Sequence, residues 1–321
     1  MLEKLGTGKR LAQWLWPVRL VRTALLLAPA VALLTGCAAL APSSTVLPTP
    51  QPLPTGTPTP NPTATPTPSP TFTAAPSFTP SPTPCQSTSG EVRREEIPSP
   101  YLAQPPAFRV YYPPCYDGSG RTRYPVLYML HGQTYNDDQW ERLGMTAATD
   151  ELIASGTSRP FLIVMPYETE DFADPYSSGY TDALLETLLP WVDANLPTCT
   201  VRECRAVGGL SRGGAYAFLL ALDHPDLFAA AGGHSMVPFG GMDNRLKRQL
   251  AAMAPGELPR LWIDMGESDR YFGDLSAYER LLTQLGVPHE THFYPGGHNE
   301  SYWAAHVEEY LRWYVAGFPG E

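Results

Sequence analysis

A serine flanked by glycines follows a short apolar run near the middle of the chain. Residues 205–208 form the run, residues 209–213 read Gly-Leu-Ser-Arg-Gly, and residues 215–222 favour a helix. A serine on a sharp turn needs neighbours without Cβ, and the first N–H groups of the following helix suit an anionic intermediate. A chain with 27 glycines also produces this pentapeptide by chance. Its strand-to-helix context predicts that Ser211 is a nucleophile.

Two further groups required for nucleophilic catalysis follow later apolar runs. His298 follows Gly296-Gly297, and such a loop can bring an imidazole to the serine hydroxyl as general base. Three carboxylates, those of Asp264, Glu267 and Asp269, lie at the end of another run. A triad acid orients the imidazole from a loop beyond the sheet, which favours Asp269 and leaves the other two as alternatives. Of the other histidines near this site, His306 lies within a predicted helix and is predicted to be a surface or packing residue, whereas His289 and His292 flank or lie within a predicted strand.

An earlier apolar run ends in His131-Gly132-Gln133. In hydrolases with a G-x-S-x-G serine, the loop after an early strand supplies a second backbone N–H to the oxyanion. We therefore predict that the N–H groups of Gln133 and Arg212 form an oxyanion hole. The alternative interpretation of His131-Gly132 is an ordinary turn.

Apolar runs alternate with helical patterns throughout the second half of the chain. The runs are continuous, which is typical of parallel strands covered on both faces. The predicted strands are 108–112, 125–130, 161–165, 205–208, 261–263 and 292–294. The predicted helices are 147–154, 181–194, 215–222, 246–253, 275–285 and 303–314. This alternation predicts an α/β fold with a mostly parallel central sheet, helices on both faces, and catalytic residues at the carboxyl ends of strands.

The first 84 residues differ in composition from the rest. A basic start and an apolar run over residues 23–34, short for a membrane span, predict an export signal over residues 1–36. Residues 34–37, Leu-Thr-Gly-Cys, resemble a bacterial lipobox in which Cys37 is lipidated, the alternative being an ordinary secretory signal. Residues 37–84, rich in Pro and Thr, predict a lipid-anchored stalk, the alternative being a disordered tail without a spacer role. Residues 85–321 then form one domain of sufficient length for a substantial core.

The predicted domain is acidic and contains four cysteines. The net charge of the chain is −10, and removal of a signal with five basic and one acidic residue makes it −14, which disfavours a nucleic-acid partner. An even cysteine count in an exported chain predicts two disulfides. Among three connectivities we favour Cys85–Cys115 and Cys199–Cys204. Zinc is the rival interpretation, but these cysteines form no C-x-x-C pair.

These motifs resemble the esterase D-like branch of the α/β hydrolases, which includes feruloyl esterases, enterochelin esterase domains, S-formylglutathione hydrolase and mycolyltransferases. The resemblance covers about residues 105–316. The residues that carry it are 128–132, Asp138, Trp140, 209–214, 266–269 and 296–298. It implies an α/β-hydrolase fold, a Ser211, His298 and Asp269 triad, and no metal or organic cofactor. The chain departs from the family at Tyr167-Glu168, where many relatives have Asp-Gly, and at Glu300, where a tryptophan is frequent.

The sequence thus predicts an exported, membrane-anchored serine carboxylesterase. The resemblance suggests feruloyl or acetyl groups on a polysaccharide as substrate. Aromatic residues that could form platforms for a ring or sugar, or else pack in the core, are Tyr135, Trp140, Tyr167, Tyr302 and Trp303. Two other functions remain open: acyl transfer to a sugar acceptor, and a non-catalytic lipoprotein that binds carbohydrate or a partner. The presence of all three triad residue types disfavours the latter.

Overall fold

The computed structural model describes residues 85–170 and 172–320. The predicted signal (1–36), the predicted stalk (37–84) and Cys37 lie outside these residues. Within the described ranges, no helix combines the length and the apolar character needed to cross a bilayer.

An eight-stranded sheet organises the domain, in the order β1-β2-β4-β3-β5-β6-β7-β8. The strands are β1 (Glu91–Glu96), β2 (Ala107–Tyr112), β3 (Val126–Leu130), β4 (Leu162–Pro166), β5 (Arg205–Leu210), β6 (Ala230–His234), β7 (Arg260–Gly266) and β8 (Glu290–Tyr294). β2 pairs antiparallel with β1 and with β4, and the pairs from β4 through β8 are parallel. The prediction of a mostly parallel α/β-hydrolase sheet is confirmed.

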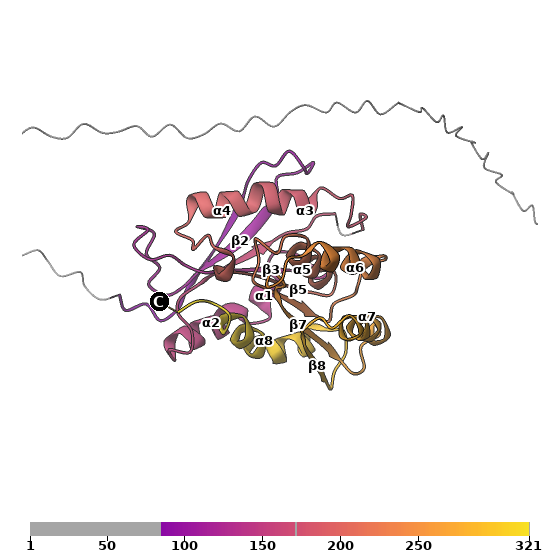
Figure 1. Cartoon of the computed structure of the whole chain (residues 1–321). Coiled ribbons are helices and arrows are strands. Elements are labelled where there is room, and N and C mark those ends of the chain that lie inside the picture. The colour runs from indigo at the N-terminus through magenta and orange to yellow at the C-terminus, as the bar shows by residue number, and fades with distance from the viewer. Residues whose placement is uncertain (1–84, 171, 321) are drawn as a thin grey trace, which may run out of the picture. The chain divides into compact units, whose positions relative to one another are not determined.

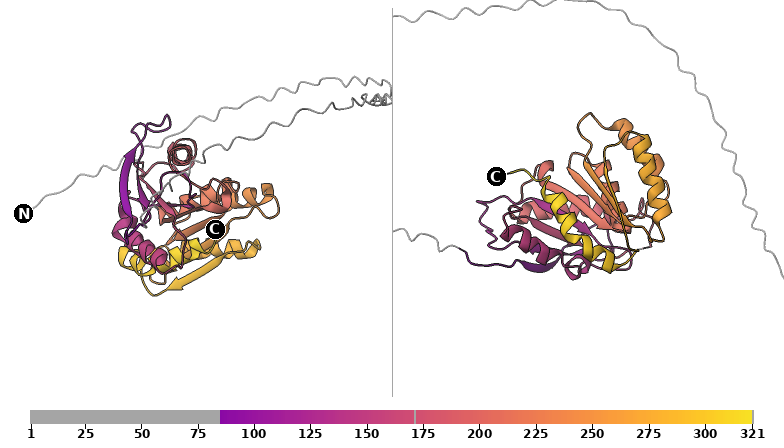
Figure 2. Two further views of the ribbon diagram at one scale, coloured as in Figure 1. Left: turned by 90° about the vertical axis from the view of Figure 1, so that its left-hand side faces the viewer. Right: turned by 90° about the horizontal axis from the view of Figure 1, so that it is seen from below.

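Helices cover both faces of the sheet, as predicted. They are α1 (Gln139–Arg142), α2 (Met145–Ala154), α3 (Tyr180–Ala183), η1 (Leu184–Leu188), α4 (Leu189–Asn195), η2 (Arg202–Cys204), α5 (Arg212–Asp223), α6 (Met242–Ala252), α7 (Phe272–Gln284) and α8 (Glu300–Val315). Figure 1 shows α3 and α4 on one side of the strands and α2 and α8 on the other. In the right-hand view of Figure 2, α8, in yellow, lies across the strands.

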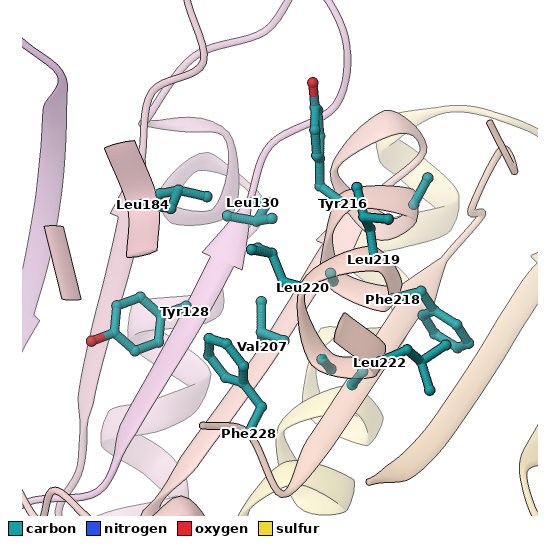
Figure 3. Close-up of a cluster of buried hydrophobic side chains, with 14 of the residues drawn as sticks. Tyr128, Leu130, Leu184, Val207, Tyr216, Phe218, Leu219, Leu220, Leu222 and Phe228 are labelled. Atoms are coloured by element: carbon teal, nitrogen blue, oxygen red, sulfur yellow. The ribbon is translucent and has the colours of Figure 1, made fainter. Parts of the chain in front are cut away.

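The alternation of side chains along β3 divides the core into two layers. Tyr128 and Leu130 pack with α3 to α7 on one face, whereas Leu127 and Met129 pack with α1, α2 and α8 on the other. Figure 3 shows part of the first layer, where Tyr128 of β3 and Val207 of β5 lie beside Leu220 of α5. Complete burial of one large apolar side chain contributes about 1.5–3 kcal/mol. This packing holds β5 and α5, the elements that flank Ser211, in a fixed relation.

Two strands were not predicted, and each has a physical reason. β1 is an edge strand rich in Glu and Arg, so it lacks the apolar run of a buried strand. β6 reads Ala-Ala-Gly-Gly-His, with none of the β-branched residues that favour strands. A Cβ on Gly232 would lie 1.9 Å from the Tyr314 hydroxyl, and one on Gly208 of β5 would lie 1.8 Å from it. The small residues therefore make room for a tyrosine of α8.

The helix predicted over residues 181–194 is divided into α3, the π-helical turn η1 and α4. Pro190, near the start of α4, has no backbone N–H to donate to the preceding turn. A π-helical turn is one way in which a helix accommodates such an interruption.

The four cysteines of the domain form the favoured pairs, Cys85–Cys115 and Cys199–Cys204. The first bond joins residues 30 apart and encloses β1 and β2, whereas the second joins residues five apart. A cross-link lowers the entropy of the unfolded chain more when its loop is longer.

Replacement of both Cys85 and Cys115 by serine is expected to lower the free energy of unfolding by about 3–4 kcal/mol, because a loop of this size is released in the unfolded state. Urea denaturation of the oxidised proteins, followed by tryptophan fluorescence, measures the difference. The single variant Cys85→Ser is the control and should lose as much as the double variant. A loss below about 1 kcal/mol in both would contradict the prediction.

Candidate active site

Ser211 occupies a strained turn between β5 and α5. Its φ is 53° and its ψ is −114°, a region that non-glycine residues rarely adopt. Flanking glycines make the turn possible. A Cβ on Gly209 would lie 2.3 Å from the carbonyl carbon of Gly213, and one on Gly213 would lie 2.4 Å from the carbonyl oxygen of His131. The Ser211 N–H donates to the carbonyl of His234 at 2.9 Å, which anchors the turn to β6.

The three predicted triad residues lie within hydrogen-bonding distance of one another. His298 Nε2 is 3.0 Å from Ser211 Oγ, and His298 Nδ1 is 2.7 Å from Asp269 Oδ2. The Asp269 side chain is fully buried, and its other oxygen accepts the Tyr271 N–H at 2.9 Å. An Nδ1–H that donates to the carboxylate leaves the Nε2 lone pair directed at the serine hydroxyl. The geometry suits proton transfer from the serine to the imidazole.

The loops that carry the acid and the histidine lie against each other. Ser268 N–H donates to the Gly296 carbonyl at 2.8 Å. A Cβ on Gly266 would lie 2.4 Å from the same carbonyl oxygen, so glycine is required for this approach. The His298 ring is in edge-to-face contact with Tyr271 at 5.0 Å and with Trp303 at 5.2 Å. The imidazole is therefore held by its hydrogen bond to Asp269 and by ring contacts with Tyr271 and Trp303.

The loop after β3 is fixed by His131. Glu168 N–H donates to His131 Nε2 at 2.8 Å, so that nitrogen carries no proton and Nδ1–H donates to the Gly132 carbonyl at 2.7 Å. The Tyr135 N–H donates to the same carbonyl at 3.1 Å. In a trans peptide the N–H of Gln133 points opposite to this carbonyl. His131 therefore sets the direction of the predicted oxyanion donor.

A second set of contacts ties this loop to the helix that follows His298. The buried Gln139 of α1 accepts the Gly132 N–H at 2.8 Å, and its amide donates to Glu300 at 3.4 Å. Arg142 forms an ion pair with Glu300 at 2.9 Å. Glu300, which departs from the family pattern, thus joins α1 to the first turn of α8.

Glu168, the other departure from the family pattern, connects the two predicted oxyanion donors. Its carboxylate accepts a bidentate contact from the Arg212 guanidinium, at 3.0 and 3.1 Å, and the Tyr216 hydroxyl at 3.1 Å. Its backbone N–H holds His131. The side chain is 3% exposed, and that of Arg212 is 11% exposed. One residue therefore links the loop after β3 to the start of α5.

Glu168→Gln is expected to lower the free energy of unfolding by about 2 kcal/mol, because the buried Arg212 guanidinium loses its counter-charge. We expect kcat to fall roughly tenfold, since small displacements of positioned groups are costly. Chemical denaturation and initial rates on a simple ester measure the two effects. Glu170→Gln is the matched control, because the Glu170 carboxylate forms no ion pair among the described residues. Unchanged stability in Glu168→Gln would contradict this role.

A cavity of about 300 Å³ opens at Ser211 and His298. The other described residues that line it are Gly132, Gln133, Thr134, Tyr135, Phe172, Arg270, Tyr271 and Trp303. Two of the five predicted aromatic platforms, Tyr135 and Trp303, are among them. Phe172, Arg270 and Tyr271 were not predicted. Phe172 is 82% exposed, an unusual position for a phenylalanine.

The other three predicted platforms do not line the cavity. Trp140 is buried and donates its indole N–H to the Leu130 carbonyl, and Tyr302 is buried with its hydroxyl on Asp264. Tyr167 packs against the His131 ring at 5.5 Å. The prediction that Trp140 and Tyr302 contact substrate is wrong because both rings are packed in the core.

Asp264, an alternative acid in the sequence, is fully buried in a network behind the site. Its carboxylate accepts hydrogen bonds from His234 at 2.7 Å and from three aromatic side chains. These are Trp262 at 3.0 Å, Tyr302 at 3.0 Å and Tyr310 at 2.7 Å. Burial, and then the Asp264 charge, raise the pKa of Tyr310 well above its ordinary value, so this hydroxyl remains a donor. The carboxylate joins β6 and β7 to α8 and does not reach His298.

Three further histidines occupy packing positions, as predicted for His306. His292 stacks on Trp262, and His306 stacks on Tyr294. His289 contacts the Val287 carbonyl through Nδ1 at 2.7 Å.

Curated proteins that share sequence with this chain include esterases. An endo-1,4-beta-xylanase/feruloyl esterase of Xylanibacter ruminicola is 37% identical over 113 residues, which are 33% of this chain and 16% of that protein. An esterase of Mycobacterium tuberculosis is 28% identical, over 54% of this chain and 48% of that protein. The chain thus spans less than half the length of these relatives.

Solved structures share the fold. A ferulic acid esterase has a TM-score of 0.64 at 22% identity, covering 73% of this chain and 100% of that chain. FphF, a fluorophosphonate-binding serine hydrolase of Staphylococcus aureus, has a TM-score of 0.61 at 21% identity, covering 71% and 99%. The family model described as "Putative esterase" matches residues 99–314, two thirds of the chain. The chain therefore belongs to the esterase family.

Proposed function

We propose that this protein hydrolyses carboxylic esters through an acyl-enzyme intermediate. Ser211 Oγ attacks the ester carbonyl while His298 Nε2 takes its proton. Asp269 orients the imidazole and stabilises its charged form. The N–H groups of Gln133 and Arg212 stabilise the oxyanion, an effect worth about 3–4 kcal/mol per donor in comparable sites. His298 then protonates the leaving alcohol, and water hydrolyses the acyl-enzyme by the same steps in reverse.

The observation that carries this proposal is the hydrogen-bonded chain from Ser211 through His298 to the buried Asp269, at 3.0 and 2.7 Å. The strained serine backbone supports it, since such strain persists where the surrounding structure imposes it and is frequent at active sites. Membership in the esterase family supports the reaction class.

We propose a small or aromatic acyl ester, a feruloyl or acetyl group on a polysaccharide, as the substrate class. The cavity of about 300 Å³ lies at the lower end of the range for ligand pockets. Aromatic side chains form several of its walls, which suits a flat ring or a sugar face. Relatives named as feruloyl esterases support the same class.

We also propose that the protein is exported and anchored to the bacterial membrane by a lipid on Cys37. The amino-acid pattern of residues 1–37 supports export and lipidation. Two disulfides support an oxidising compartment. Labelling of cells with a palmitate analogue tests the anchor, and Cys37→Ser should carry no label.

The reaction is tested with purified residues 85–321 on p-nitrophenyl acetate, methyl ferulate and acetylated xylan. We expect release of acid from at least one ester, together with stoichiometric labelling by a fluorophosphonate. Absence of both in folded, oxidised protein would overturn the proposal. Faster acyl transfer to an added sugar than to water would replace hydrolysis by transfer.

A further inference from the structure

Among the described residues that line the cavity at Ser211, Arg270 alone carries a permanent charge. Of the described residues that line it, none is an aspartate, glutamate or lysine. Arg270 directly follows Asp269 in the chain and is itself exposed. A substrate in this cavity therefore encounters a guanidinium close to the reacting groups.

Arg270 has no carboxylate partner among the described residues. Most arginines of the domain form ion pairs there, including Arg142 and Arg212 at the same site. Arg212 is neutralised by the buried Glu168, at 3.0 Å, so its charge is not offered to a ligand. A cation with no ion-pair partner among the described residues, placed in the active-site cavity of a chain with a net charge of −10, favours anionic ligands over neutral ones. It raises the local concentration of anions that the rest of the surface repels.

The guanidinium is oriented by the same turn that holds the triad acid. It lies over the Tyr271 ring, with its carbon 4.8 Å from the centroid, and the Tyr271 ring contacts His298 at 5.0 Å. The Tyr271 N–H in turn donates to Asp269. Stacking covers one face of the guanidinium and leaves the N–H groups at its edge for hydrogen bonding. That edge matches a planar carboxylate through two parallel hydrogen bonds.

We propose that Arg270 is a specificity-determining residue that selects esters bearing a carboxylate on the acyl or the alcohol part. The inference rests on the proposed ester hydrolysis and adds a free carboxylate to the esters that this site prefers. A single planar fork suits a monoanionic carboxylate, whereas a phosphate dianion calls for several donors. The unesterified carboxylate lies on Arg270 while the scissile carbonyl lies at Ser211.

Two matched ester pairs test this proposal. Phenyl acetate and 3-acetoxybenzoate differ by a carboxylate on the alcohol part, and phenyl propionate and monophenyl succinate by one on the acyl part. For each pair, kcat/KM of the anionic ester is divided by that of the neutral one, after subtraction of spontaneous hydrolysis. We expect Arg270→Gln to lower this ratio roughly tenfold or more in at least one pair. Any loss on the neutral esters should be smaller than the loss on the anionic ones, and Arg270→Lys should restore part of the ratio.

Arg280→Gln is the matched control, because it removes the same charge from α7 at a position that does not line the cavity. Its ratios should equal those of wild type. The pair that responds to Arg270→Gln identifies the part of the substrate that carries the carboxylate. Equal ratios in wild type and Arg270→Gln would overturn the proposal, as would an equal loss on neutral and anionic esters. Failure of wild type to turn over any of the four esters, together with failure to react with a fluorophosphonate, would instead overturn the proposed hydrolysis.

Discussion

Ser211→Ala is expected to lower kcat by a factor of roughly 10⁵ or more, because the variant retains the cavity and the imidazole but has no nucleophile. The residual rate comes from groups that bind the ester and its oxyanion. Single-turnover and steady-state measurements on p-nitrophenyl acetate give the ratio. Labelling by a fluorophosphonate should disappear in the same variant.

The folded state of Ser211→Ala is expected to be nearly unchanged. The substitution removes one hydrogen bond, with His298 at 3.0 Å, and keeps a Cβ in the same backbone conformation. The free energy of unfolding should differ from wild type by about 1 kcal/mol or less. Equal labelling of variant and wild type would assign the nucleophile to another residue.

Asp269→Asn is expected to lower kcat by about 10⁴, through the tautomer of His298. The carboxylate oxygen 2.7 Å from His298 Nδ1 accepts a proton from it, whereas an amide NH₂ at that place donates one. The proton then resides on Nε2, which faces Ser211 and can no longer accept. The pH dependence of kcat, measured beside wild type, reports the change.

The other two carboxylates after the same strand provide controls for Asp269→Asn. Asp264→Asn should lower the free energy of unfolding by about 3 kcal/mol, because an amide cannot accept all the hydrogen bonds that the buried carboxylate receives. Its kcat per folded molecule should fall far less than that of Asp269→Asn. Glu267→Gln is exposed and should change stability by less than about 0.5 kcal/mol. A larger loss of kcat in Asp264→Asn than in Asp269→Asn would make Asp264 the acid.

Local chemistry made much of the site predictable from the sequence. The role of Ser211 was predicted from the glycines next to it in the sequence, and the role of His298 was predicted from the two glycines that precede it. The parallel sheet was also predictable from local sequence. Strands buried on both faces, such as β3 and β5, are continuous apolar runs of consecutive residues. The structure then places Ser211, Asp269 and His298 together from three separate loops.

The remainder depends on contacts that no local pattern encodes. Glu168 was visible only as a departure from a family pattern, because its partner Arg212 is 44 residues away. Aromatic residue type did not distinguish Trp303, at the cavity, from Trp140, in the core. β6 was missed because glycine has a low strand propensity, and the glycine at position 232 is required by the close approach of Tyr314 from α8. In each case the residue's role depends on a contact with an element that is distant in the sequence.

The Cys85–Cys115 bond gives the domain a mechanical property. Cys85 is the first residue that the structure describes, and the bond encloses the edge strand β1 and its neighbour β2 within one covalent loop. A force that pulls on the chain from its N-terminal side is transmitted through the disulfide to Cys115 and the segment before β3. β1 and β2 lie inside the closed loop, so this force does not pull β1 away from the sheet. The load reaches β3, which is paired on both sides by β4 and β5. While this disulfide is intact, such a force therefore reaches the sheet at an interior strand rather than at its edge.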